Sequence, residues 1–158
     1  MRILLPIDHS ICSSAAVRAL AAQFSPSGTE VRVMHAVEWP KGLPPYLAYA
    51  EGATAARDVL RTRGDEIESG RFLADGIAQE LRAAGFTTSI DVREGDAKAM
   101  ILAAAGEWRP DVIVIGSHGR TGLDRFFIGS VAEHVMRHAA CSVEIVPPAA
   151  AQVLMAEA

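Results

Sequence analysis

The segment from Gly116 to Ser130 holds the residues whose types and spacing best suit chemistry on a bound ligand. Its glycines allow the backbone to turn so that successive N–H groups point inward and form a concave site for an anion. Ser130 stands where a helix is predicted to begin, and the free N–H groups and dipole of a helix N-terminus also favour negative charge. The two ends of this one segment therefore predict an anion site, such as a phosphate site.

Side chains in the same segment offer further hydrogen-bond donors, namely Ser117, His118, Arg120 and Ser130. Arg120 could neutralise a phosphate, although exposed arginines are common in loops. The alternative interpretation is a plain turn followed by a capped helix, in which Ser130 and Glu133 form a capping box. A cap alone needs neither Gly116 nor Gly119, so the sequence favours the anion site.

Four other polar side chains have two interpretations each. Asp8 follows an apolar run, where it would either cap the next helix or accept hydrogen bonds from a ligand, and both roles are compatible. Histidine is a common acid–base catalyst, but no Ser or Cys nucleophile pairs with His118 in sequence, which favours a ligand contact or a plain loop residue over catalysis. His134 and His138 lie four residues apart, and we favour an interaction with a helix C-terminus over a metal site.

Apolar runs and helical patterns alternate along the chain, and this alternation predicts an α/β fold in a single domain. We expect an open five-stranded parallel sheet with helices on both faces and the strand order 3-2-1-4-5. Ligands of such folds bind beyond the carboxyl ends of the strands, where the strand order reverses. The predicted strands are 3–7, 30–37, 87–92, 111–115 and 142–146, and the predicted helices are 11–23, 51–84, 96–107 and 130–138.

The long helical pattern at 51–84 contains both core candidates and possible breaks. Its candidate core contacts are Val59, Ile67, Phe72, Ile77 and Leu81. Gly64, Gly70 and Gly76 lie inside it, and each costs about 1 kcal/mol relative to Ala in a helix interior, which predicts a break or a kink. The segment from Trp39 to Tyr46 holds three prolines and a glycine, so it is predicted to be a loop.

Composition narrows the class of protein. The chain has 158 residues and a formal net charge of −4, and we find no basic run of the kind that binds nucleic acid. No stretch approaches the ~20 apolar residues that span a bilayer. Cys12 and Cys141 have no short spacing, which argues against a disulfide scaffold or a zinc site and favours buried thiols in a reducing, cytoplasmic compartment. We expect one domain at 1–147 and a flexible tail at 148–158.

The glycine pattern resembles the signature of a known family. Gly116-x-x-Gly119, nine further residues and then Gly129-Ser130 look like the signature of the universal stress protein family. The opening strand with Asp8, the strand at 33–37, the Gly95-Asp96 pair and the closing strand also follow the family's order. The resemblance covers about residues 1–147, and a spaced three-glycine motif in a strand–loop–helix setting is far more specific than a lone glycine pair.

The resemblance implies a fold, a ligand and the residues around it. The complete glycine motif marks the family's ATP-binding branch, so the implied ligand is ATP, with Mg²⁺ carried on its phosphates. Asp8 would accept a hydrogen bond from a ribose hydroxyl or from adenine, and Ala36 would pack against the base. The residues that would surround the nucleotide are Pro6, Ile7, Asp8, Ala36, Ile115, Gly116, Ser117, His118, Gly119, Arg120, Gly129, Ser130 and Val131.

The family also implies a regulatory role in stress and a homodimer through the closing strand, Ser142 to Val146. Glu144 departs from the family's apolar pattern there, and its charge could weaken the pairing or set its register. Two alternatives remain open at this stage. One is a slow nucleotide hydrolase, although the chain has neither a P-loop nor a dinucleotide fingerprint. The other is an interaction scaffold that binds no ligand or a different nucleotide, such as a cyclic one.

Overall fold

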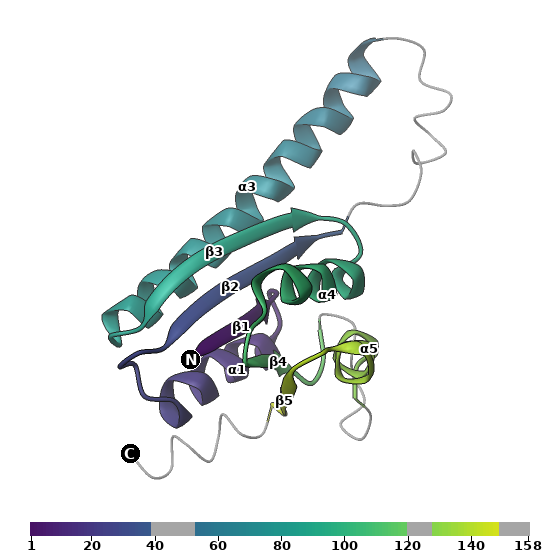
Figure 1. The fold of residues 1–158 in the computed structure, drawn as a ribbon. Coiled ribbons are helices and arrows are strands. Elements are labelled where there is room, and N and C mark those ends of the chain that lie inside the picture. The colour runs from purple at the N-terminus through teal and green to yellow at the C-terminus, as the bar shows by residue number, and fades with distance from the viewer. Residues whose placement is uncertain (39–52, 120–127, 149–158) are drawn as a thin grey trace.

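The computed structural model describes residues 1–38, 53–119 and 128–148, and Figure 1 shows their arrangement. Five parallel strands form one sheet in the order β3-β2-β1-β4-β5, which confirms the predicted α/β fold and strand order. The strands are β1 (Arg2–Ile7), β2 (Glu30–Val37), β3 (Thr87–Glu94), β4 (Val112–Gly116) and β5 (Ser142–Val146). The described helices are α1 (Ile11–Gln23), α3 (Ala53–Ala83), α4 (Ala97–Trp108) and α5 (Ser130–His138).

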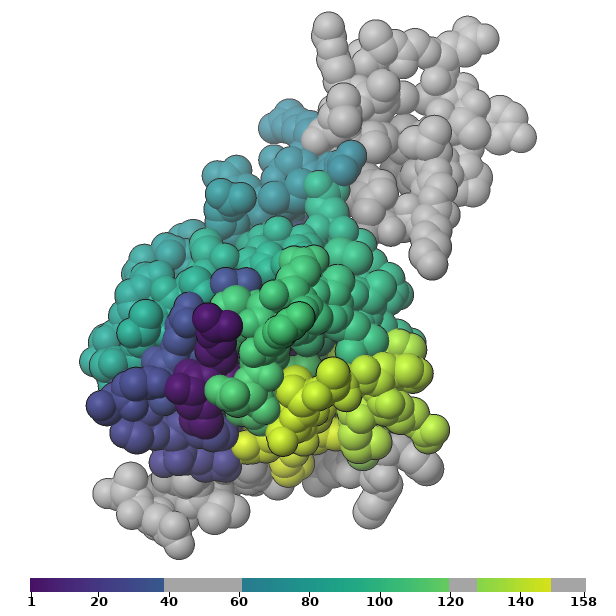
Figure 2. All heavy atoms as spheres, viewed as in Figure 1, coloured from purple at the N-terminus to yellow at the C-terminus, as the bar shows by residue number. Residues whose placement is uncertain are grey.

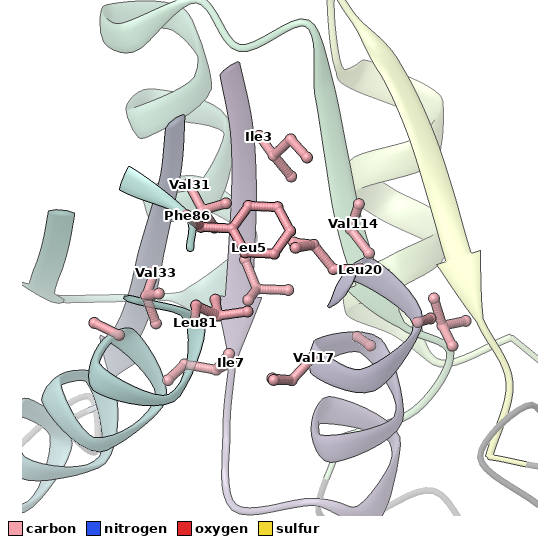
Figure 3. Close-up of a cluster of buried hydrophobic side chains, with 14 of the residues drawn as sticks. Ile3, Leu5, Ile7, Val17, Leu20, Val31, Val33, Leu81, Phe86 and Val114 are labelled. Carbon is pink, nitrogen blue, oxygen red and sulfur yellow. The ribbon is translucent and has the colours of Figure 1, made fainter. Parts of the chain in front are cut away.

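Helices cover both faces of the sheet because its central strands are apolar on both sides. On one face, α1 and α3 pack on a cluster that includes Leu5, Leu20 and Leu81, whose side chains point toward one another in Figure 3. On the other face, α4 and α5 pack on a cluster that includes Leu4 and Met34. Figure 2 shows the α3–β3 end in teal and the α5–β5 end in yellow-green on opposite sides of the molecule.

The strand register places the ends of three strands side by side. Ile7, the last residue of β1, is paired with His35 of β2, and Leu4 of β1 is paired with Ile113 of β4. The strand order reverses between β1 and β4, and the residues that follow these strands therefore meet at the carboxyl edge of the sheet. This is the place that the sequence predicted for a ligand.

Side-chain caps and backbone conformation set the ends of several helices. Ser10 Oγ accepts from the Ser13 amide at 3.1 Å at the start of α1, and Asp96 Oδ1 accepts from the Ala99 amide at 3.2 Å at the start of α4. Gly85 follows α3 with a φ of 95°, a conformation that favours glycine. β3 extends to Glu94, two residues beyond its predicted end.

Helix α3 differs from its prediction in two respects. It is one continuous helix through its internal glycines, with no break. Phe72, a predicted core contact, is 83% exposed, because the residues that face the sheet are Ala74, Ala78 and Leu81 at helical spacing and Phe72 lies on the other side of the helix. The N-terminal turns of α3 project past the arrowheads of β2 and β3 (Figure 1).

Two further predictions concern segments that the structure does not describe, or describes only in part. The predicted loop from Trp39 to Tyr46 lies outside the described residues, and so does the tail from residue 149 onward. Among the residues that the structure describes, no helix is long and apolar enough to cross a membrane.

Candidate functional site

A cavity of about 320 Å³ lies at the carboxyl ends of β1, β2 and β4. The loops after β1 and β4, the first turns of α4 and α5, and one face of α3 enclose it. Every predicted site residue within the described ranges lines this cavity: Pro6, Ile7, Asp8, Ala36, Ile115, Gly116, Ser117, His118, Gly119, Gly129, Ser130 and Val131. Arg120 lies outside those ranges. Contact between these residues and a ligand stays a prediction.

Backbone hydrogen bonds hold the two ends of the glycine-rich segment together. The Ser117 amide donates to the Val146 carbonyl at 2.8 Å, and the Gly129 amide donates to the Ser117 carbonyl at 2.7 Å. The chain therefore returns to the end of β4 before α5 begins, and Ser130 and Val131 line the cavity at the start of that helix. The positive end of the α5 dipole consequently borders the cavity, which suits an anion.

Two glycines of the motif, Gly116 and Gly129, are needed for space, and none of the three has an unusual backbone conformation. A Cβ on Gly116 would lie 2.6 Å from the backbone carbonyl carbon of Cys12, and a Cβ on Gly129 would lie 2.9 Å from the Ser117 carbonyl oxygen. A Cβ on Gly119 would lie 3.0 Å from Asp8 Oδ2. None of the three has a positive φ. Our explanation from backbone freedom is therefore wrong at these positions. Backbone atoms exclude a Cβ at Gly116 and Gly129, and the Asp8 carboxylate crowds one at Gly119.

The predicted capping box at the start of α5 does not form. The N-cap residue is Gly129, which has no side chain to cap the helix, and no other described side chain does so. Ser130 is already within the helix, and Glu133 instead accepts a hydrogen bond from Arg137 at 2.8 Å. Within the described part of the chain, no side chain accepts from the first N–H groups of α5, which suits a ligand in the cavity that accepts from them.

Asp8 organises the loop after β1 but does not itself cap α1. Its Oδ1 accepts from the Ser10 amide at 3.0 Å and lies 2.5 Å from Ser10 Oγ, and its own amide donates to Ser13 Oγ at 3.1 Å. Ser10 Oγ also lies 3.2 Å from the His118 carbonyl oxygen. Asp8 therefore does not cap α1. It holds Ser10, which is the cap residue, and Ser10 in turn connects the loop after β1 to the loop after β4.

His118 leaves a polar atom without a partner beside the cavity. Its Nδ1 lies 3.0 Å from Ser117 Oγ, whereas its Nε2 is buried and has no hydrogen-bond partner in the described part of the chain. A buried polar atom without a partner costs roughly 1–3 kcal/mol, and native proteins contain few of them. A ligand that supplied the missing hydrogen bond would remove this cost.

Sequence reasoning missed the opposite wall of the cavity, which β2, α3 and α4 form. Its members are His35, Val37, Glu38, Glu66, Ser69, Gly70, Ala97 and Ile101. The spacing of Glu66, Ser69 and Gly70 signals one shared helix face, since residues three and four apart are neighbours on a helix. That this face borders the same cavity as the glycine motif is a consequence of how α3 crosses the sheet.

Ion pairs and a side-chain hydrogen bond tie the elements around this second wall together. Glu94 of β3 pairs with Arg63 of α3. Arg93 donates to both oxygens of Glu107 on α4, at 3.0 and 2.8 Å. The hydrogen bond from Arg93 lowers the pKa of the Glu107 carboxyl group below its usual value. In addition, Glu38 Oε1 accepts from the Ala97 amide at 3.0 Å.

The described lining is acidic in its side chains and contains no Lys or Arg. Its carboxylates belong to Asp8, Glu38 and Glu66, and its imidazoles to His9, His35 and His118. Within the described ranges, no three His, Cys, Asp or Glu side chains are placed to hold a metal ion. Among the described residues, the groups that would attract an anion are therefore the backbone N–H groups at the start of α5 and imidazole N–H groups.

Two predictions concern side chains away from the cavity, namely the histidine pair of α5 and the two cysteines. His134 and His138 stack at a centroid distance of 4.2 Å, and His138 Nδ1 lies 2.8 Å from the His134 carbonyl oxygen in the last turn of α5. Cys12 is buried as predicted. Cys141 is only partly buried, and desolvation raises the pKa of its thiol.

Comparison of the sequence with known proteins identifies a matching family and several relatives. The family model described as "Universal stress protein family" matches residues 1–147. A universal stress protein of Synechocystis sp. is 26% identical over 148 residues, covering 92% of this chain and 96% of the relative. A universal stress protein of Methanocaldococcus jannaschii is 30% identical over 148 residues, covering 92% of this chain and 81% of the relative.

Solved structures share the fold. The M. jannaschii protein MJ0577 is 23% identical, with a TM-score of 0.76 over 92% of this chain and 94% of that one. A family member from Arabidopsis thaliana, solved with AMP bound, is 18% identical, with a TM-score of 0.62 over 93% and 91%. A universal stress protein in complex with cAMP is 20% identical, with a TM-score of 0.54 over 94% and 97%. At these identities the likeness establishes the fold alone.

Proposed function

Because the chain belongs to the universal stress protein family, we propose that it is a regulatory stress protein that binds ATP in the cavity between β1, β2 and β4. The observation that carries the proposal is the pairing of an uncapped helix N-terminus with an unpartnered buried nitrogen. Among the described residues no side chain caps the start of α5, and none is a hydrogen-bond partner of His118 Nε2. Both features suit a phosphate that accepts hydrogen bonds.

The proposed orientation follows from the distribution of donors and apolar atoms in the cavity. The phosphates lie against the N–H groups of Ser130 and Val131, with His118 beside them. The adenosine then extends toward β1 and β2, where Ala36 offers an apolar contact and Asp8 Oδ2 can accept from a ribose hydroxyl. Arg120 is the predicted residue of this set that lies outside the described ranges.

Mg²⁺ fits this proposal as a companion of the phosphates rather than as a resident of a protein site. Mg²⁺ usually keeps several waters and binds through one or two carboxylates together with substrate phosphates. Among the described residues no cluster of three ligating side chains exists, and Asp8 has one carboxylate oxygen engaged by Ser10.

Two family relatives solved with adenine nucleotides support the choice of ligand class, since one holds AMP and the other cAMP. We propose binding with little or slow hydrolysis. Rapid phosphoryl transfer depends on metal and cationic clamps placed at the phosphates. Within the described lining, no Lys or Arg is available for that role.

The direct test is to denature freshly purified protein, identify any released nucleotide by mass spectrometry, and titrate the emptied protein with ATP by calorimetry. Gly119→Val is expected to weaken ATP binding at least tenfold, because the added atoms would occupy the space between the loop and Asp8. Gly106→Val is the matched control, since a Cβ on Gly106 meets nothing within 4 Å. Absence of both released nucleotide and saturable ATP binding in the parent protein would contradict the proposal.

We also propose a homodimer through β5. Strand β5 is at an edge of the sheet, and an exposed edge offers unpaired N–H and C=O groups for pairing with a second chain. Light scattering on the purified protein should give about twice the chain mass of 16.8 kDa. A monomer mass across the concentration range would overturn this part of the proposal and leave ATP binding untouched.

A further inference from the structure

We propose that Ser117 is a positioning residue for His118, whose ring it holds in one tautomer. The Ser117 hydroxyl donates to Nδ1, so that the proton of the neutral imidazole lies on Nε2. The sequence predicted both side chains as donors to a ligand, without a link between them. The position of the proton follows from contacts within the chain. Its use rests on the proposed function, because a protonated Nε2 is a donor that suits a bound phosphate.

The first argument is that the backbone holds the two side chains in a fixed relation. The Ser117 amide donates to the Val146 carbonyl at 2.8 Å, and the Ser117 carbonyl accepts from the Gly129 amide at 2.7 Å. The carbonyl oxygen of His118 lies 3.2 Å from Ser10 Oγ. Ser117 is only 6% exposed. Its hydroxyl therefore depends on neighbouring protein groups, rather than on bulk water, for a hydrogen-bond acceptor.

The second argument concerns the direction in which that hydroxyl donates. Ser117 Oγ lies 3.0 Å from His118 Nδ1 and 3.9 Å from Cys12 Sγ. A thiol sulfur is a weak acceptor, whereas an imidazole nitrogen at 3.0 Å is at an ordinary hydrogen-bond distance. The single hydroxyl proton consequently goes to Nδ1. An Nδ1 that accepts carries no proton, so a neutral ring carries its proton on Nε2.

The opposite tautomer satisfies these groups less well. Nδ1 would then donate to Ser117 Oγ, and the buried hydroxyl would have the sulfur of Cys12, 3.9 Å away, as its acceptor among the described residues. A buried donor with so poor a partner costs part of the free energy of a hydrogen bond. The contacts of Ser117 therefore favour the proton on Nε2.

The third argument concerns what lies beside Nε2. A Cβ on Gly129, the N-cap residue of α5, would lie 3.8 Å from His118 Cδ2, the ring carbon bonded to Nε2. Nε2 is buried, and no described residue is its hydrogen-bond partner. A protonated Nε2 adds a donor to the N–H groups at the start of α5, whereas a bare Nε2 would present a lone pair that repels an anion. Ser117 thus makes His118 act together with the helix N-terminus.

The test observes the proton directly. Long-range proton–nitrogen correlation spectra of isotope-labelled protein distinguish protonated from bare ring nitrogens, and we would record them at about pH 8, where ordinary histidines are neutral. Loss of signals in His118→Gln identifies those of His118. The parent protein without nucleotide should show Nε2 protonated and Nδ1 bare. In Ser117→Ala the signals should move toward the average of two exchanging tautomers, because the hydroxyl that holds the ring in one tautomer is deleted.

Calorimetric titration with ATP measures the consequence for binding. Ser117→Ala should bind ATP about threefold to tenfold more weakly than the parent, the value of one net hydrogen bond. Cys12→Ala is the matched control, since Cys12 is equally buried and removes only the weak acceptor of the same hydroxyl. It should keep the single tautomer and the ATP affinity of the parent. Unfolding midpoints establish that each variant is folded.

The outcomes separate this inference from the function on which it rests. A parent spectrum with Nδ1 protonated, or a single Nε2 tautomer that persists in Ser117→Ala, would overturn the role of Ser117 and leave ATP binding in place. The same change of tautomer in Cys12→Ala as in Ser117→Ala would also overturn it, because repacking would then be the cause. If the parent binds no ATP, the proposed function fails, whereas the spectrum of the free protein still decides where the proton lies.

Discussion

The two walls of the cavity are held in place by different means. At the glycine-rich wall, backbone atoms of β4, β5, α1 and the start of α5 contact one another directly, as the Gly129–Ser117 and Ser117–Val146 hydrogen bonds and the Gly116–Cys12 approach show. At the wall of β2, α3 and α4, side chains bridge the elements, through ion pairs such as Arg93–Glu107 and the bond from Ala97 to Glu38.

This difference predicts that the two walls respond differently to substitutions and to changes in salt and pH. Close-packed backbone leaves no room for added atoms, and the cost of an added methyl group is steric and independent of salt and pH. Partly exposed ion pairs contribute little each and are screened by salt. The glycine-rich wall should therefore be sensitive to substitution, while the second wall should be sensitive mainly to solution conditions, except where Gly70 brings the α3 backbone against His35.

The largest effect should come from Gly116→Ala. Its Cβ would lie 2.6 Å and 2.7 Å from the carbonyl carbon and oxygen of Cys12, so α1 must move away from β4. We expect a loss of about 3 kcal/mol in the free energy of unfolding, measured by urea denaturation. A loss smaller than that of a typical surface substitution would mean that this wall is not close-packed.

A pair of substitutions within α3 should give the next largest effect. Gly76→Ala has open space around its Cβ and should stabilise the protein by about 1 kcal/mol through helix propensity. Gly70→Ala gains the same propensity, but its Cβ would overlap the His35 ring, so we expect a net loss of about 1 kcal/mol. Equal stabilisation by both, in urea denaturation, would show that α3 does not press on His35.

The smallest effect should come from Glu107→Gln, and it should depend on pH. Because the folded state lowers the pKa of Glu107, the Arg93–Glu107 pair contributes stability above the ordinary carboxyl range, and this contribution is lost as the pH falls through the lowered pKa. The parent protein should accordingly lose slightly more stability than Glu107→Gln between about pH 6 and pH 3. Thermal unfolding across this range measures the difference, and 1 M salt should reduce it.

Local patterns were enough to predict most of the elements, but they carry no information about which side of a long helix meets the sheet. The caps Ser10 and Asp96 and the glycine after α3 follow from short-range hydrogen bonding and backbone conformation, so they were predictable. Phe72 was placed in the core from its apolar character alone. Its exposure reflects the rotation of α3 about its axis, which contacts with distant strands decide.

The candidate site, like the fold, has one part that the sequence predicted and one part that it did not. By itself, the sequence determined the strand–loop–helix segment that carries Gly116, Gly119 and Gly129, since these residues are close together in the chain and their pattern is specific. Only the tertiary structure decided why the glycines are required, and that α3 and β2 complete the cavity with Glu66 and His35. The physical reason is that steric exclusion and cavity walls arise between residues far apart in sequence, here Gly116 with Cys12 and Gly70 with His35, and no local pattern records such approaches.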